Sequence, residues 1–511
     1  MPKKQVKRIA KTGEIYAYYI DCLGKYGACQ IIAVQEKSIC LLTLDYLELT
    51  PPGEDMLEDL KPYHRESYRY HHQMAKSWFD KSPVPRDYLL IGECGLKTDP
   101  VCNSYSGRKW PMGEDYCYEE RWKALDEKAR AAYKKYINSG EFVTVHGQMF
   151  KKNLGGLRDE LYQCLTEEDS LEDFPCIRYA EVKGYSRKLV KYCSTAPMLR
   201  TLRLENSGVE ILDFRDTHLE HLELDMSDIR ELILPKTIRS LHMYGNITSD
   251  LQINDTFCAG KIDLHLSLKK AIPIRYGLKN LQVCRLHLKE MNELDMMQIV
   301  ENFSEIEHLG IWGLPGSVVH MDAVRQLRAL RSLYCQDLFG FVASEMEALQ
   351  ELPELREIDF DSIPKEAGAY LKKVWKGRLD ILSVTHLREE GWLRENLENP
   401  LRHWDGNEFI PQAAYRSARK CYKDTKKQLL EATGREQIEE IVRGYTRHFN
   451  KLNEKYEEFI ETEEREDIFQ AMQNLYEECI LHGVCRETDE KKAPITLEEV
   501  WDVMESVRED W

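Results

Sequence analysis

The feature that most constrains this chain is a hydrophobic pattern that recurs five times. Each copy has apolar residues at its first, fourth and sixth positions, as in Val283-x-x-Leu286-x-Leu288. The copies begin at Val283, Ile306, Leu330, Leu355 and Leu379, so their starts lie 23, 24, 25 and 24 residues apart. Such regular spacing predicts that each copy forms the same structural unit and stacks on the next one.

The same pattern recurs at a shorter spacing upstream. Copies begin at Leu199, Val209, Leu219, Ile229 and Ile238, which are 10, 10, 10 and 9 residues apart. Ten residues are too few for one turn of a stacked coil, so we expect two copies per turn, with a short extended segment on each side. Downstream, helices are expected to replace one of these segments at residues 294–303, 321–327, 343–349 and 366–374.

A period of about 24 residues with this apolar core resembles the leucine-rich repeats, whose units have roughly 20–29 residues. The resemblance implies that residues 195–395 form a solenoid. An uncapped first repeat would expose apolar surface. We therefore interpret residues 116–194, which include a charged helix over 118–138, as a helical linker and solenoid cap.

The repeat geometry also selects a candidate binding surface. In a strand alternate residues point to opposite faces, so the residues beside the buried leucines share the concave face. They run from basic through aromatic to acidic: Arg285, His287, His308, Trp312, Tyr334, Gln336, Glu357, Asp359 and Asp361. Exposed aromatic side chains flanked by charges are typical of protein interfaces. The alternative is a face covered by the chain's own terminal domains.

Residues 1–115 are expected to form a small β domain. Aromatic and β-branched runs joined by tight turns predict strands at 14–20, 26–34, 38–44 and 87–92, in a strongly bent sheet or small barrel. A helix is predicted over 67–79.

Three short motifs in this domain suggest a family. They are Gly13-Glu-Ile-Tyr-Ala, then Gly24-Lys-Tyr-Gly followed by Gln30-Ile-Ile, and Tyr88-Leu-Leu-Ile-Gly. The domain resembles a β-rich immunity-protein family of bacterial polymorphic toxin systems, although Glu14 stands where aspartate is common. The resemblance implies a bacterial protein that neutralises a cognate toxin by binding the toxin domain directly.

Residues 396–511 are predicted to be helical, with segments at 411–432, 435–463, 467–482 and 497–507. In the second segment apolar residues recur at spacings of mostly three and four, which indicates one buried face. The expected fold class is therefore an α+β multidomain protein: a small bent β-sheet or barrel, a leucine-rich-repeat solenoid and a C-terminal helical bundle.

We find no motif that indicates catalysis, a cofactor or a metal. Gly313-Leu-Pro-Gly-Ser317 resembles a phosphate-binding loop, but a strand-to-helix connection explains it more simply. His218 and His221 would point to opposite faces of a strand and make a poor metal pair. Tyr68-Arg-Tyr-His-His72 could stack on RNA bases. However, a net charge of −17 disfavours nucleic acid, so an ordinary amphipathic helix is the simpler interpretation.

The sequence predicts a cytoplasmic location. No apolar run is long enough to span a membrane, and no apolar segment follows the basic N-terminus. The 15 cysteines are scattered singly, which favours free thiols in a reducing compartment.

Together these features predict a non-enzymatic protein-binding protein, specifically an immunity protein whose partner is a toxin domain. The alternative is a leucine-rich-repeat scaffold or regulatory protein with a self-associating helical C-terminus.

Overall fold

The computed structural model describes residues 8–68, 70–106, 110–111, 113–248, 250–269, 278–389, 391–396, 399–456, 458–481, 495–509 and 511. The chain is a mixed α/β protein with a large parallel sheet, and it divides into two compact units that meet between Leu387 and Arg388. The finer division at 1–115, 116–194, 195–395 and 396–511 stays a prediction.

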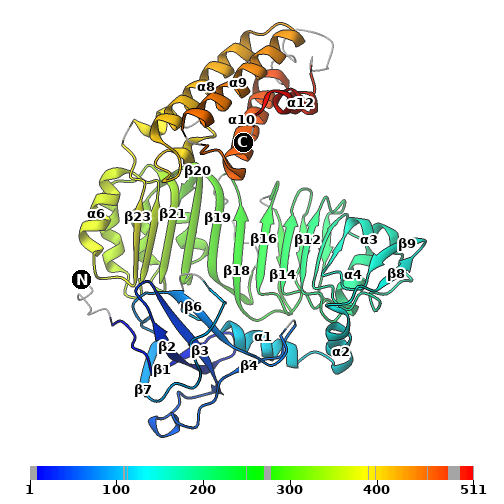
Figure 1. Ribbon diagram of the computed structural model, residues 1–511, viewed down its shortest axis with the longest axis vertical. Helices are drawn as coiled ribbons and strands as arrows, with labels where there is room; N and C mark the ends of the chain where they lie inside the picture. Colours follow the sequence, from blue (N-terminus) through cyan, green and yellow to red (C-terminus); the bar gives the residue numbers. More distant parts are fainter. Residues whose placement is uncertain are drawn as a thin grey trace. The chain divides into compact units, whose positions relative to one another are not determined.

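The first unit begins with an antiparallel sheet of five strands in the order β6-β3-β2-β1-β7 (Figure 1). Four of these strands match the predicted ones: β1 (Glu14–Ile20), β2 (Lys25–Val34), β3 (Ser38–Glu48) and β7 (Tyr88–Glu93). Side chains on both faces of β1 are buried, with Tyr16 and Tyr18 in one core and Ile15 in another. No pairing joins β6 to β7 in the described residues, so the sheet is open and not a barrel.

The helix predicted over 67–79 is wrong. The segment contains β5 (Gln73–Met74), which pairs with β4 (His64–Arg65), and most of β6 (Lys76–Asp80). Residues of β6 pair with Ser38 to Leu42 on β3. Ladder hydrogen bonds to a strand distant in sequence therefore override the local helical pattern.

The helix predicted over 118–138 is two helices, α1 (Glu114–Lys123) and α2 (Glu127–Tyr136). Asp126 separates them because its side chain accepts hydrogen bonds from the backbone N–H groups of Lys128 and Ala129, at 2.9 and 3.3 Å. This is the arrangement of a helix N-cap, so a second helix begins there.

The prediction that all cysteines are free is wrong for one pair. Cys22, in the turn after β1, forms a disulfide with Cys117 on α1. The other cysteines among the described residues are free.

The large sheet has eleven parallel strands, and its order follows the sequence apart from three strands that lie elsewhere (Figure 1). The strands are β10 (Gly156–Arg158), β11 (Tyr179–Lys183), β12 (Thr201–Glu205), β14 (His221–Asp225), β16 (Ser240–Tyr244), β18 (Gly260–Ser267), β19 (Leu281–Asp295), β20 (His308–Val319), β21 (Ser332–Phe339), β22 (Glu357–Asp361) and β23 (Ile381–Thr385). The apolar residues at the fourth position of the five copies lie in register: Leu286, Leu309, Leu333, Ile358 and Leu382.

The ten-residue spacing predicted upstream corresponds to the half of the large sheet that contains β12, β14 and β16. Strands β13 (Ile211–Asp213), β15 (Glu231–Ile233) and β17 (Gln252–Asn254) alternate along the chain with strands of the large sheet and form a second parallel sheet of three strands. One apolar core contains side chains from both sheets. The prediction of an extended segment on each side is confirmed, because every second copy belongs to the opposite sheet.

Helical segments follow the later strands as predicted, but only two of the four are α-helices. These are α5 (Met296–Asn302) and α6 (Lys365–Trp375), while η2 (Met321–Gln326) and η3 (Glu345–Glu351) are tighter 3₁₀ helices. The sheet also extends further towards the N-terminus than the repeat pattern, since β10 and β11 lie within residues 116–194. Strand pairing alone does not establish a leucine-rich-repeat solenoid, so the solenoid stays a prediction.

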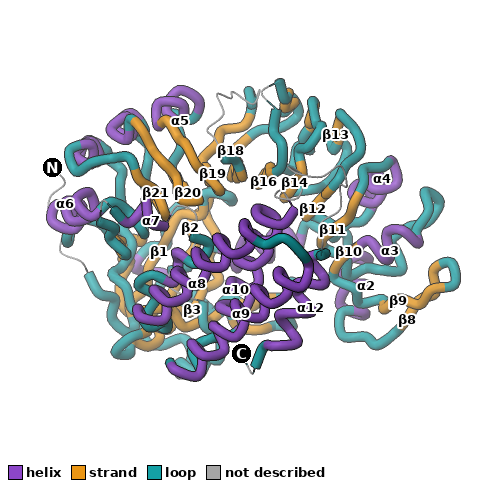
Figure 2. Tube along the Cα trace, turned by 90° about the horizontal axis from the view of Figure 1, so that it is seen from above, coloured by secondary structure: helices purple, strands orange, loops and turns teal. Residues whose placement is uncertain are grey.

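The second unit is a group of helices with its own apolar core (Figure 2). It contains α8 (Gln412–Glu431), α9 (Arg435–Lys455), α10 (Thr462–Leu475) and α12 (Leu497–Val507), with a π-helical turn, η5 (Tyr476–Leu481), after α10. Helix α9 ends before the predicted residue 463, because a new helix begins at Thr462. Its capping box pairs the side chains of Glu461 and Glu464 with each other's backbone N–H groups.

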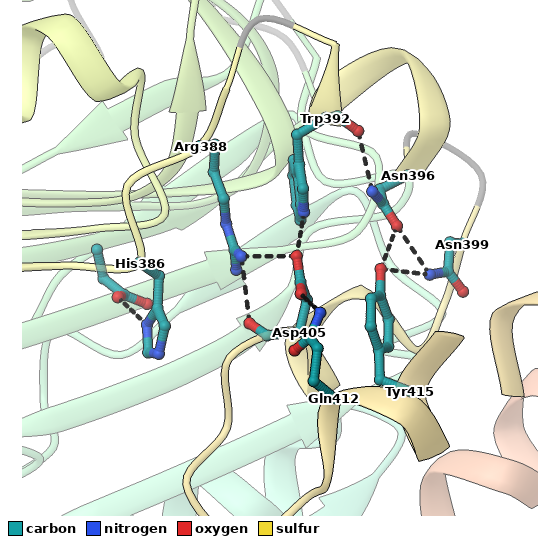
Figure 3. A network of polar contacts seen from close by, with 9 residues as sticks. His386, Arg388, Trp392, Asn396, Asn399, Asp405, Gln412 and Tyr415 are labelled. Atoms are coloured by element: carbon teal, nitrogen blue, oxygen red, sulfur yellow. Dashed lines mark hydrogen bonds and ion pairs between the residues drawn. The ribbon is translucent and has the colours of Figure 1, made fainter. Parts of the chain in front are cut away.

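A polar network stabilises the entrance to this unit (Figure 3). Asp405 accepts hydrogen bonds from Arg388 at 2.9 Å, from Gln412 at 2.6 Å and from the Trp392 indole. The guanidinium of Arg388 also lies over the Trp392 ring, 4.2 Å from its centre. These contacts join α7 (Trp392–Asn396) to the segment just before α8, which is a structural role.

Candidate functional site

The predicted site residues lie in three rows across the large sheet. Strand pairing places His287, Gly310, Tyr334 and Asp359 side by side, and we call this line the middle row. Arg285, His308 and Glu357 lie two residues before it on their strands, while Trp312, Gln336 and Asp361 lie two residues after it. Because residues two apart in a strand point the same way, the three rows share one face of the sheet.

The middle row carries an unbroken line of aromatic rings. His265 on β18 stacks on His287, with ring centres 4.3 Å apart and planes inclined by 4°. His287 stacks on Trp312 at 5.6 Å, and Trp312 lies 4.6 Å from Tyr334. His242 on β16 extends the line on the other side, 5.9 Å from His265. We call these five side chains the aromatic ladder.

Gly310 makes room for Trp312 in this ladder. The backbone of Trp312 lies outside the middle row, yet its ring contacts rings on both sides of Gly310. A Cβ atom on Gly310 would come within 2.6 Å of Trp312 Cη2 and Cζ3 and within 3.2 Å of His287 Nδ1. The indole ring of Trp312 therefore occupies the space that a side chain at position 310 would fill.

The histidines of the aromatic ladder are held neutral. Burial lowers the pKa of His287, and the neighbouring His265 lowers it further, to about 4. Burial also lowers the pKa of His265 and of His242, with Lys289 adding to the effect on both. At neutral pH this part of the face is an uncharged aromatic surface.

The face ends in carboxylates on β22. Glu357, Asp359 and Asp361 are alternate residues of this strand, all partly exposed. Asp361 accepts hydrogen bonds from Thr385 at 2.5 Å and from His386 at 2.6 Å. Burial, followed by the charges of Asp359 and Asp361, raises the pKa of Tyr334 to about 12, so its phenol stays protonated.

At the other end of the face, the charged side chains pair with one another. Arg203 on β12 lies within 4 Å of Glu181, Glu205 and Glu223, which are on its own strand and both neighbouring strands. Arg285 is similarly 3.6 Å from Asp263. The acidic strand β22 therefore gives the face its net negative end, next to the aromatic ladder.

The structure brings the predicted residues together and adds two. Trp312, Tyr334 and Asp359 lie on adjacent strands as expected, while His242 and His265 were missed. A usable signal was present for both, because each stands between two apolar residues, as in Leu241-x-Met243 and Leu264-x-Leu266. Whether the nine predicted residues bind a protein remains a prediction.

The N-terminal part of the chain contacts a different region of the large sheet. Arg86 donates to Asp380 at 3.0 Å and to the Arg378 carbonyl oxygen at 2.9 Å, and Asp87 pairs with Arg356. Arg121 on α1 lies 3.4 Å from Glu220. These sheet residues precede the strands, so the contacts run along the edge where strands begin.

The motifs behind the immunity-protein resemblance have structural roles. Gly27 faces Tyr116, whose ring carbon would lie 2.6 Å from an added Cβ, and Gly92 faces Leu57 at the same distance. Buried Gln30 donates to the Gly95 carbonyl oxygen and accepts from the Lys97 backbone, both at 2.9 Å. These residues have packing and hydrogen-bonding roles in and beside the five-stranded sheet.

Two other sequence candidates have structural roles as well. The segment from Gly313 to Ser317 is part of β20, not a loop before a helix, and a Cβ on Gly313 would lie 2.2 Å from the Asp337 carbonyl oxygen. This close backbone approach explains the glycine without a phosphate. Tyr68 contacts the rings of Trp122 and Tyr133 in a small core, instead of offering a free stacking surface.

The described residues contain no group of three or more His, Cys, Asp or Glu side chains arranged to hold a metal ion. Within the same residues, every helix is too short or too polar to cross a membrane.

Comparison with known proteins gives little beyond this geometry. No protein-family model and no curated protein match the chain. Among solved structures it is similar to the LRIM1 leucine-rich repeat domain, with 14% identity, a TM-score of 0.25, and coverage of 40% of this chain and 74% of that one. It is also similar to the LRIM1/APL1C complex, with 14% identity, a TM-score of 0.24, and coverage of 72% and 85%. These TM-scores transfer no function.

Proposed function

We propose that this chain is a non-enzymatic interaction protein of the leucine-rich-repeat type, which binds another protein on the three-row face of its large sheet. The observation that carries the proposal is the aromatic ladder. Five neighbouring rings, from His242 to Tyr334, form a continuous and uncharged strip on the face. Large aromatic side chains of this kind contribute most of the binding energy in many protein interfaces.

The charges beside the ladder indicate the chemistry of the partner. Glu357, Asp359 and Asp361 form an acidic border on β22, while arginines at the opposite end are paired with carboxylates. A partner segment with lysine or arginine beside an apolar or aromatic residue complements this arrangement, because its cations would meet the carboxylates. Arginine could also stack on Trp312 or Tyr334.

Affinity capture from the native host tests the proposal. The wild-type chain is expected to retain a partner that Trp312→Ala and Tyr334→Ala lose, with at least about a 30-fold rise in Kd for the purified partner, since central aromatic residues often contribute 2 kcal/mol or more. Phe257→Ala is the matched control, because Phe257 is 57% exposed but lies outside the face. Equal capture by wild type and both face variants would contradict the proposal.

A narrower form of the proposal makes the partner a toxin domain and the chain a cytoplasmic bacterial immunity protein. It rests on the N-terminal motifs and on the acidic charge, which suits a basic toxin. Co-expression with a basic toxin domain from the native host is the test. Rescue of growth by the wild-type chain supports this form, and growth arrest despite soluble expression of both proteins contradicts it.

Self-association through the helical second unit is part of the scaffold form of the proposal. Phe409, Leu430 and Trp501 expose 75%, 60% and 38% of their surfaces there, which is apolar area that a second copy could cover. Light scattering of the full-length chain is expected to give a dimer that Leu430→Glu dissociates. A monomer at all concentrations would contradict self-association but not the proposed binding face.

A further inference from the structure

A cavity of about 350 Å³ lies where the small β domain meets the segment between α6 and β23. Arg8, Arg86 and Arg378 line one part of it, and Val84, Leu90 and Leu379 provide apolar walls. It is lined by none of the residues of the three-row face, so its role is independent of the proposed function. Its combination of cationic and apolar walls suggests a small ligand with both characters.

Two of the three arginines are already neutralised. Arg8 pairs with Glu14, whose carboxylate also accepts a hydrogen bond from Tyr16 at 2.5 Å. Arg86 pairs with Asp380 at 3.0 Å. Each of these guanidinium groups therefore has a carboxylate partner and adds little net charge to the cavity.

Arg378 differs from the other two. Its Nη1 is buried and has no hydrogen-bond partner in the part of the chain that the structure describes, where no carboxylate pairs with it either. Leaving a buried donor of a charged group unsatisfied is unfavourable, and such groups normally meet an anion, a carbonyl oxygen or a water molecule. The cavity thus has about one uncompensated positive charge.

The phenols near the cavity supply no negative charge. Tyr88 donates its hydroxyl hydrogen to the Pro111 carbonyl oxygen, and Tyr16 donates to Glu14. Burial raises the pKa of both tyrosines, so both are neutral at physiological pH. Neither phenol therefore compensates the guanidinium of Arg378.

We propose that this cavity binds a small organic carboxylate, with its carboxylate on Arg378 and its apolar part against Val84, Leu90 and Leu379. A guanidinium presents two parallel N–H donors that match the two oxygens of a carboxylate. A single uncompensated charge fits a monoanion better than a dianionic phosphate. The apolar walls favour an organic ligand over an inorganic anion.

Ligand-observed NMR with benzoate as the probe tests this site in the full-length chain. Benzoate is expected to bind at least about tenfold more tightly than benzamide, its neutral analogue of the same shape, because only benzoate gains the ion pair. Arg378→Gln is expected to abolish that difference. Its fold should be preserved, since the structural bonds here use the backbone carbonyl of Arg378 and not its side chain.

Two further variants make the result specific. Arg230→Gln removes an exposed arginine that does not line the cavity and is expected to bind benzoate like the wild type. Leu90→Asp places a negative charge on the apolar wall and should lose benzoate binding; Leu90 is already 42% exposed, so folding should tolerate it. The proposal is overturned if benzoate and benzamide bind equally, if neither binds, if Arg378→Gln binds benzoate like the wild type, or if inorganic phosphate binds as tightly as benzoate.

Discussion

At the scale of single residues, the face depends on one glycine. Gly310 lies in the middle row, and its missing side chain lets the Trp312 ring lie between His287 and Tyr334. The sequence identified Trp312 as a surface residue but could not predict where its ring lies. The direction of the Trp312 side chain depends on residues of neighbouring strands. We infer that Gly310 determines the geometry of the aromatic ladder.

Gly310→Ala is therefore expected to displace the Trp312 ring and to destabilise the first unit by about 1–3 kcal/mol through overpacking. With 5-fluorotryptophan incorporated, the ¹⁹F resonance of Trp312, assigned from Trp312→Phe, should shift. Gly140→Ala is the control, because an added Cβ there meets no atom within 4 Å. An unshifted Trp312 resonance in Gly310→Ala would contradict this role.

The protonation of His287 gives a second prediction at this scale. Its folded-state pKa of about 4 lies below the usual 6.5, so the unfolded chain binds more protons between these pH values. The stability contributed by neutral His287 is present above pH 6.5 and is lost as the pH falls towards 4. Its NMR titration should show a midpoint near 4, and His287→Phe should reduce the loss of stability on acidification.

His320 is the internal reference for that titration. It is exposed, and its hydrogen bond to Asp295 at 2.9 Å raises its pKa above the ordinary value. The two histidines should therefore titrate on opposite sides of pH 6.5. A midpoint for His287 at or above 6.5 would show that the ladder does not bury this ring.

At the scale of elements, one aspartate connects the end of β17, in the three-stranded sheet, to the start of β19, in the large sheet. Asp255 follows β17, is 2% exposed, and accepts hydrogen bonds from the backbone N–H groups of Lys279, Asn280 and Leu281 at 2.8, 2.7 and 3.0 Å. These donors lie at the start of β19. Its carboxylate thus fixes the backbone at the start of β19, where the strands with the 24-residue spacing begin.

Asp255→Ala is expected to lower the free energy of unfolding by about 3 kcal/mol, because three backbone donors, including that of buried Leu281, lose a charged acceptor. Urea unfolding followed by circular dichroism measures the effect, and Asp216→Ala, at an exposed position, should change it by less than about 0.5 kcal/mol. If both variants unfold at the same urea concentration, Asp255 does not have this role.

Elements that repeat were predictable, whereas elements that depend on distant pairing were not. Leu286, Leu309 and Leu333 were aligned correctly because the same apolar spacing recurs in each copy. Residues 67–79 were misassigned because β6 forms through pairing with β3, about forty residues earlier, which no local pattern records. The cavity beside Arg378 was unpredictable for the same reason, since it joins residues more than 280 positions apart.

At the scale of the whole molecule, the first unit has two distinct surfaces on its large sheet: the edge where the strands begin, and the three-row face. Helix α1 and the segment just before β7 contact the edge of the large sheet through pairs such as Arg121 with Glu220 and Asp87 with Arg356. The aromatic ladder and the carboxylates of β22 lie on the strands themselves. These two contacts of the N-terminal part therefore involve none of the residues of the three-row face.

Hydroxyl-radical footprinting of the captured complex tests the binding proposed for the three-row face most directly. Oxidation of Trp312 and Tyr334 is expected to fall at least about fivefold when the partner binds, because a central interface residue is shielded from solvent. Met149 and Phe257, which are 71% and 57% exposed outside the face, should be oxidised at unchanged rates. Unchanged oxidation of Trp312 and Tyr334 in a complex that protects other residues would place the binding surface elsewhere and contradict the account.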